Sequence, residues 1–128
     1  MLRYRNEAAF SNALVKAMRA KGWFVQRIES GQTGRGIPDI YCIDNRKEAW
    51  WLELKREHTN ITPVIAISWR PGQQAWLNDV TKRGQHCLTI ACFNNGIVQI
   101  PHDVIYPGNS VDTTRGIKIC NSIKELIT

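Results

Sequence analysis

The fold of this chain is decided by residues 39–56, which read DIYCIDNRKEAWWLELKR. Two runs rich in β-branched and aromatic side chains, residues 39–44 and 49–56, flank a short polar turn at residues 45–48. Alternating apolar runs around a polar turn are typical of two strands joined as an antiparallel hairpin. We therefore expect a β-hairpin at the centre of the fold.

The register of this hairpin predicts which charged side chains meet. If Asp44 pairs with Ala49, paired residue numbers sum to about 93, and Asp39 lies within one residue of Glu53. Because side chains alternate along a strand, Glu53 and Lys55 share one face while the leucines between and before them share the other. The hairpin therefore predicts a cluster of two carboxylates and a lysine.

The cluster indicates phosphodiester chemistry. Two adjacent carboxylates repel each other unless a proton or cation separates them, and hard oxygen ligands at an open edge suit Mg²⁺. The carbonyl of Leu54 can add a ligand, and Lys55 can orient an attacking water or neutralise charge on a phosphate. The alternative is that Glu53 and Lys55 form the solvated face of an edge strand and Asp39 is an ordinary turn residue.

The rest of the chain predicts a mixed α/β domain with element order α-β-β-β-α-β-β-β-α. The expected elements are a helix over 6–21, strands over 22–28, 39–44 and 49–56, a helix over 71–84, strands over 86–93, 97–100 and 117–120, and a helix from 122. Asn6 is expected to cap the first helix, and Pro71 to lie in the first turn of the second. The Asn94-Asn95-Gly96 triplet predicts a type I′ hairpin, and Ser122 with Glu125 a capping box.

Residues 71–84 are expected to bury a stripe of Trp76, Leu77 and Val80. Residues 57–70 have no predicted regular structure, and residues 30–36 form a glycine-rich loop. This loop lacks the Gly-Lys-Ser/Thr ending of a P-loop and the G-x-G-x-x-G pattern, so no nucleotide cofactor is expected.

Composition narrows the class of protein. With 128 residues we expect one domain over 1–128, and no apolar run approaches the ~20 residues of a membrane span. The net charge of +6 favours a polyanionic partner such as nucleic acid. The N-terminus lacks the apolar stretch of a secretory signal, which predicts a cytoplasmic protein. The four cysteines form no C-x-x-C pair and the three histidines are isolated, so neither a zinc site nor a disulfide framework is expected.

The segment Gly36-Ile-Pro-Asp39 followed by Glu53-Leu-Lys55 resembles the catalytic core of the PD-(D/E)xK nuclease superfamily. It is most similar to the virus-type replication–repair nuclease (VRR-NUC) branch, because Gly34 and Arg35 precede the motif, Glu7 lies in the first helix and Gln73-x-x-Trp76 opens the second. The resemblance covers about two-thirds of the chain and includes none of the last third.

The resemblance implies a restriction-endonuclease-like fold, with an α-β-β-β-α-β core around a mixed sheet and, here, an additional C-terminal hairpin and helix. It implies Mg²⁺ or Mn²⁺ held by Asp39 and Glu53, Lys55 as the residue that handles water, and Gln73 near that lysine or a phosphate. It also implies an endonuclease selective for branched or Holliday-junction DNA in replication, recombination or repair.

Two further positions carry both a functional and a structural interpretation. Glu7 lies seven residues before Leu14 and is expected to face the sheet with the core stripe, either as a metal ligand or as a charge that stabilises the helix dipole. Arg35, between Gly34 and Gly36, suits a phosphate clamp, whereas the alternative is a solvated arginine at a loop tip.

The apolar residues 61–69 show neither a clean helical nor a clean strand period. We expect them to contribute to a homodimer interface or to a wall that faces a DNA junction, and not only to cover the core. A symmetric dimer would provide two active sites for paired cuts. Two other functions remain open, namely a non-catalytic nucleic-acid-binding module on the same fold and a restriction-type or flap nuclease.

Overall fold

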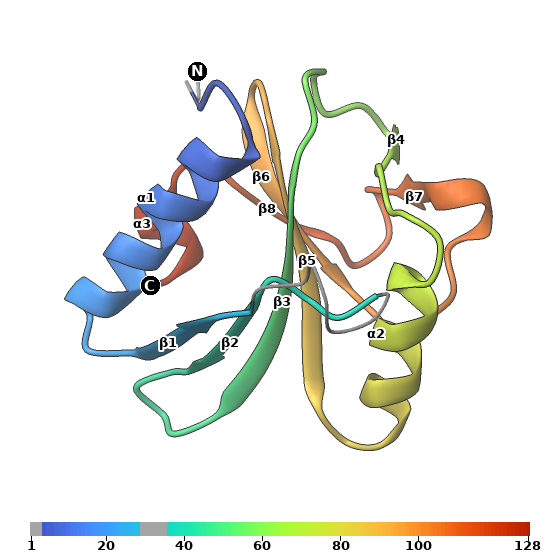
Figure 1. The fold of residues 1–128 in the computed structure, drawn as a ribbon. Coiled ribbons are helices and arrows are strands. Elements are labelled where there is room, and N and C mark those ends of the chain that lie inside the picture. The colour runs from blue at the N-terminus through green and yellow to red at the C-terminus, as the bar shows by residue number, and fades with distance from the viewer. Residues whose placement is uncertain (1–3, 29–35) are drawn as a thin grey trace.

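A six-stranded mixed sheet forms the centre of the computed structural model, which describes residues 4–28 and 36–128 (Figure 1). The strands of this sheet lie in the order β1-β2-β3-β5-β6-β8, and only β3 and β5 pair in parallel within the described residues. Its strands are β1 (Phe24–Arg27), β2 (Ile40–Ile43), β3 (Ala49–Arg56), β5 (His86–Phe93), β6 (Gly96–Pro101) and β8 (Lys118–Cys120). The helices are α1 (Glu7–Ala20), α2 (Gln73–Lys82), α3 (Ile123–Leu126) and the 3-10 turn η1 (Pro107–Asn109).

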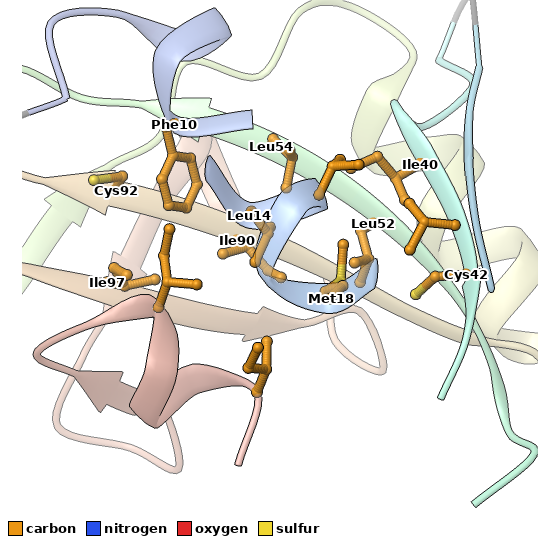
Figure 2. Close-up of a cluster of buried hydrophobic side chains, with 14 of the residues drawn as sticks. Phe10, Leu14, Met18, Ile40, Cys42, Leu52, Leu54, Ile90, Cys92 and Ile97 are labelled. Atoms are coloured by element: carbon orange, nitrogen blue, oxygen red, sulfur yellow. The ribbon is translucent and has the colours of Figure 1, made fainter. Parts of the chain in front are cut away.

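Helix α1 follows the sequence prediction closely. The Asn6 side chain accepts the Ala9 N–H at 2.8 Å and caps the helix. Phe10, Leu14 and Met18 recur at helical spacing and are all buried. These side chains pack against the apolar face of β3, as Figure 2 shows, so α1 covers one face of the sheet together with α3.

The β2–β3 hairpin forms as expected, with a register one residue away from the predicted one. Ile43 pairs with Ala49 and Ile40 with Leu52, so paired numbers sum to 92. The turn absorbs the difference because Asp44 accepts the N–H groups of Arg46 and Glu48 with its own side chain. The same register, continued by one residue, sets Asp39 directly opposite Glu53.

The prediction for residues 61–69 is wrong about their period. Residues Val64–Ala66 form β4, which pairs with β7 (Ser110–Asp112) in a separate two-stranded sheet. Ile65, Ile67 and Trp69 alternate with exposed residues and are buried in a second apolar core on the other face of the main sheet. The segment therefore covers the core, and Val64, 61% exposed, is its one strongly exposed large apolar residue.

Helix α2 lies on the same face and differs from the prediction in two respects. It begins at Gln73, because Gly72 caps it with a left-handed backbone (φ +91°) and Pro71 lies before the cap. Its fully buried side chains are Gln73, Leu77 and Asn78, while the predicted core residues Trp76 and Val80 are only half-buried. Two polar side chains thus belong to the buried face of α2.

The C-terminal third contains the expected hairpin and helix, with one correction. The β5–β6 hairpin has Asn94 and Asn95 as its two-residue loop, but neither residue has the positive φ that a type I′ turn requires. Both asparagines are instead held by residues before β4, since Asn94 N–H donates to the Thr59 carbonyl and Ile61 N–H donates to Asn95 Oδ1. The Ser122 cap on the Glu125 N–H is confirmed.

Within the ranges 4–28 and 36–128, no helix is long and apolar enough to cross a membrane.

Candidate active site

Asp39 lies at the entrance of β2 and reaches across to β3. Pro38 before it is buried, and the Asp39 carbonyl accepts the N–H of Ile28, which ties the start of β2 to the end of β1. Its Oδ2 accepts the backbone N–H of Leu54 at 2.8 Å. The carboxylate is therefore fixed against the β3 backbone one residue beyond Glu53.

Glu53 is the most deeply buried acidic side chain of the cluster, with 1% of its surface exposed. Its Oε2 accepts a hydrogen bond from Gln73 Nε2 at 3.1 Å and lies 3.5 Å from Lys55 Nζ. Its Oε1 is buried and has no hydrogen-bond partner among the described residues. Burial, and then the neighbouring charge of Asp39, raise the pKa of Glu53 to about 8 although Lys55 acts in the opposite direction.

Lys55 and Gln73 form the second half of the cluster. Lys55 is 5% exposed, and its Nζ donates to Gln73 Oε1 at 2.8 Å. The same Oε1 accepts the backbone N–H of Arg70, while the amide nitrogen donates to Glu53. These three contacts leave only one sensible orientation of the Gln73 amide, with oxygen toward the cation and nitrogen toward the carboxylate.

Gln73, and not its neighbour Gln74, thus contacts the cluster. The resemblance implied Gln73 for this position, and the structure brings it to Lys55 and Glu53 by starting α2 at this residue. Gln74 points elsewhere and bonds the backbone of Tyr106.

Glu7 lies at the first residue of α1 and is exposed, so it does not share the buried stripe with Leu14 as predicted. Loss of hydration and then the charge of Asp39 raise the pKa of Glu7, while Lys55 and Arg70 act in the opposite direction. The side chain therefore lies within electrostatic reach of the cluster, at its solvent side. Its position fits both the metal-ligand and the helix-dipole interpretations.

Gly36 explains how the segment before Asp39 reaches the cluster. It has φ +88°, and a Cβ at this position would collide with the Gly72 carbonyl and lie 3.1 Å from Trp76 Cβ. Only glycine lets the chain pass this close to the start of α2. Gly34 and Arg35 lie outside the described residues, so the predicted phosphate clamp stays a prediction.

Two groups around the cluster were not found by sequence reasoning. Arg70 anchors Gln73 through its backbone and adds a positive charge beside Glu7. Thr89, the parallel partner of Glu53, accepts the indole N–H of Trp69 at 3.0 Å and bonds His102 Nε2 at 2.8 Å. No spacing rule could have revealed them, because the β3–β5 pairing brings Thr89 to Glu53 and the start of α2 brings Arg70 to Gln73, both from far along the chain.

The donor set of this cluster suits a divalent cation. Asp39 and the unpartnered Oε1 of Glu53 supply carboxylate oxygens. The N–H and the carbonyl of Leu54 both point from β3 toward the strand that carries Asp39. Continued by two residues, the β2–β3 register sets Pro38 opposite Leu54. Proline has no N–H, so it cannot donate a hydrogen bond to the Leu54 carbonyl. Among the described residues, no group of three or more His, Cys, Asp or Glu side chains is arranged to hold a metal ion.

The arrangement of a mixed sheet, α1 on one face and α2 on the other, is a restriction-endonuclease-like fold. The chain is similar in structure to the Holliday junction resolvase Hjc of Archaeoglobus fulgidus, with a TM-score of 0.62 and 12% sequence identity over 84% of this chain and 88% of that one. It is also similar to a VRR_NUC domain, with a TM-score of 0.51 and 22% identity over 68% of this chain and 84% of the other.

The other two comparisons add no relatives. No protein-family profile matches the sequence, and no curated protein matches it. At these identities the likeness establishes the fold, and the function rests on the site.

Proposed function

We propose that this protein is a Mg²⁺- or Mn²⁺-dependent endodeoxyribonuclease that hydrolyses phosphodiester bonds in branched DNA. The observation that carries the proposal is the cluster itself, in which Asp39 before β2 and Glu53 on β3 lie opposite each other beside a buried lysine held by Gln73. An ordinary solvated strand face would not bury Glu53 and Lys55 to this extent.

Asp39, Glu53 and the Leu54 carbonyl would hold the cation, with Glu7 at the solvent side. A bound divalent cation supplies Lewis-acid stabilisation of charge on the phosphate. Lys55 Nζ, positioned by Gln73, orients the attacking water or stabilises negative charge that develops on the phosphate oxygens. The buried surroundings of Glu53 and Lys55 strengthen each of these interactions relative to bulk water.

Branched DNA is the substrate class that the fold neighbours favour, since one of them is a Holliday junction resolvase. The net charge of +6 suits contacts to the DNA backbone without sequence preference. A homodimer would place two such clusters at a fixed separation for cuts in two strands. We propose such a dimer, and Val64 is the strongly exposed large apolar side chain that residues 61–69 could offer to its interface.

The test is a panel of labelled substrates, comprising linear duplex, flap and four-way junction, each with Mg²⁺, with Mn²⁺ or with EDTA. We expect metal-dependent cleavage, with the junction cut fastest. Asp39→Asn and Glu53→Gln should abolish cleavage and leave DNA binding nearly unchanged, because they remove metal ligands and not the basic surface. The matched control is Glu48→Gln, which changes an exposed carboxylate on the β2–β3 turn and should leave cleavage normal.

The panel also separates the alternative functions. Fast cleavage of the flap or of the linear duplex, together with slow cleavage of the junction, would favour a flap or restriction-type nuclease. DNA binding without cleavage under any metal condition would identify a non-catalytic binding module and reject the proposed activity.

A further inference from the structure

The loop of residues 102–109, between β6 and β7, holds two neighbouring apolar side chains in solvent. Val104 is 50% exposed and Ile105 is 72% exposed. Neither is required by the two apolar cores, which lie elsewhere. Adjacent large apolar side chains on a surface are a common mark of a binding site.

This loop is anchored to α2 by hydrogen bonds. Asn78 Nδ2 donates to the carbonyls of His102 and Val104, at 2.8 Å each. Gln74 both donates to the Tyr106 carbonyl and accepts the Tyr106 N–H, at 3.2 Å each. A loop fixed in this way presents its side chains without an ordering cost on binding.

A groove of about 520 Å³ runs between α2 and this loop. Its lining includes Arg70, Gln74, Asp79, Lys82 and Ile105. The groove begins next to the catalytic cluster, because Gln74 follows Gln73 and Arg70 N–H bonds the Gln73 side chain. Along α2, from Gln74 to Lys82, it extends for roughly 12 Å.

The charges of the groove favour an anionic occupant. Arg70 lies at one end and Lys82 at the other, and neither forms an ion pair with another described residue. The acid in the groove, Asp79, is already paired with Arg83 at 3.4 Å. Cations at both ends with an apolar wall between them match a DNA strand, whose phosphates are charged and whose bases are apolar on their faces.

We propose that this groove holds an unpaired DNA strand next to the scissile phosphate, with Ile105 against its bases and Lys82 at its backbone. The inference rests on the proposed nuclease function and specifies which part of the DNA the site takes. An intact duplex keeps its bases stacked, so an apolar wall of this kind contributes only where bases leave the stack, as they do when an apolar side chain enters a base step.

Fluorescence of 2-aminopurine tests the role of Ile105. The probe is a four-way junction with 2-aminopurine within three nucleotides of the branch, mixed with the full chain in EDTA so that no cleavage occurs. We expect binding to raise the fluorescence by about twofold or more, as apolar side chains that enter a base step unstack it. Ile105→Ser should lose most of this rise, and Ile119→Ser, an exposed isoleucine on the opposite edge strand β8, should keep it.

The salt dependence of binding tests Lys82. Lys82→Gln should reduce the slope of log K against log salt by about 0.7 for the junction, the value expected for loss of one single-strand phosphate contact. Lys124→Gln, an exposed lysine on α3 on the other face of the sheet, should leave the slope unchanged. Circular dichroism of each variant should match that of the wild type, since all four side chains are exposed.

The outcomes separate this inference from the proposed function. If the wild type cleaves junctions but Ile105→Ser and Lys82→Gln match it in fluorescence and salt slope, the groove does not hold the strand and the inference is overturned. If the wild type cleaves no DNA with either metal, the nuclease proposal fails instead. Loss of the fluorescence rise in Ile119→Ser as well would also overturn the assignment to this groove.

Discussion

Lys55 Nζ donates a hydrogen bond of 2.8 Å to Gln73 Oε1, although the two residues lie 18 positions apart and in different elements. Lysine has a long flexible side chain, so a reactive ammonium group requires something to hold it in place. The Gln73 side chain holds the Lys55 ammonium group through its oxygen and donates to Glu53 through its nitrogen. It therefore links the lysine to the carboxylate.

Removal of this link should reduce cleavage far more than DNA binding. We expect Gln73→Ala to lower kcat by about 100-fold with little change in KM, because Lys55 is no longer positioned for the chemical step. Single-turnover cleavage of the preferred substrate measures the loss. Gln85→Ala, an exposed glutamine just beyond α2, is the matched control. A parallel fall in DNA affinity would show that Gln73 acts in binding and not in positioning.

The close approach of Gly36 to Gly72 should be visible in stability. Gly36→Ala is expected to lower the free energy of unfolding by about 3 kcal/mol, since it combines a left-handed backbone with a collision against the Gly72 carbonyl. Gly84→Ala has the same sign of φ but open space around it, so it should cost only about 1 kcal/mol. Urea unfolding compares the two. Equal losses would mean that backbone strain alone matters at Gly36.

The buried His102 should contribute a loss of stability in mild acid, which the raised pKa of Glu53, about 8, opposes over part of the same range. Burial lowers the pKa of His102 to about 4, with the charge of Asp103 acting in the opposite direction, whereas in the unfolded chain it titrates near 6.5. Between these values the unfolded state binds the extra proton, so the His102 contribution to stability is lost as pH falls from about 6.5 to about 4. The imidazole accounts for about 3 kcal/mol of this loss.

Urea midpoints measured from pH 7 to pH 4 check this expectation. His102→Gln should change the slope of stability against pH by about one proton relative to the wild type, even though it also lowers stability at pH 7. His58→Gln, which changes an exposed histidine, should retain the wild-type slope. An unchanged slope in His102→Gln would assign the acid sensitivity to other groups.

Trp69 is buried and Val64 is exposed, so substitutions at these two positions should have different effects. Trp69→Ala should destabilise the protein by about 3–5 kcal/mol, because the indole is buried and its N–H bonds Thr89.

Val64→Ser should change stability little, since this side chain is exposed. Sedimentation velocity of Val64→Ser then tests whether the exposed valine contributes to a homodimer. A wild-type dimer that dissociates in this variant would place Val64 in the interface, whereas an unchanged dimer would exclude it.

Much of the site could be read from local pattern. The alternation of residues 49–56 and the short polar turn before them were enough to place Asp39 next to Glu53, because a tight hairpin leaves little freedom of register. The cap at Asn6 and the stripe of α1 followed from local helix chemistry in the same way.

The features that sequence reasoning missed are set by contacts between distant segments. Strand β4 is three residues long and exists because it pairs with residues 110–112, far along the chain. The turn at Asn94 and Asn95 lacks type I′ geometry because both residues are held by the loop after β3. The burial of Gln73 and Asn78 on α2 likewise depends on polar partners from other elements, which helical periodicity cannot reveal.

The parallel pairing of β3 with β5 has a consequence for how the protein folds. The two strands are joined by a long crossover that contains β4 and α2, so the ends of this connection must meet before Gln73 can reach Lys55. Closing a long loop is slower than forming a hairpin, and long-range pairing delays the folding of β-rich domains. On dilution from urea, the far-ultraviolet circular dichroism signal should therefore return before DNA cleavage does, and the rate at which cleavage returns measures the closure of this crossover.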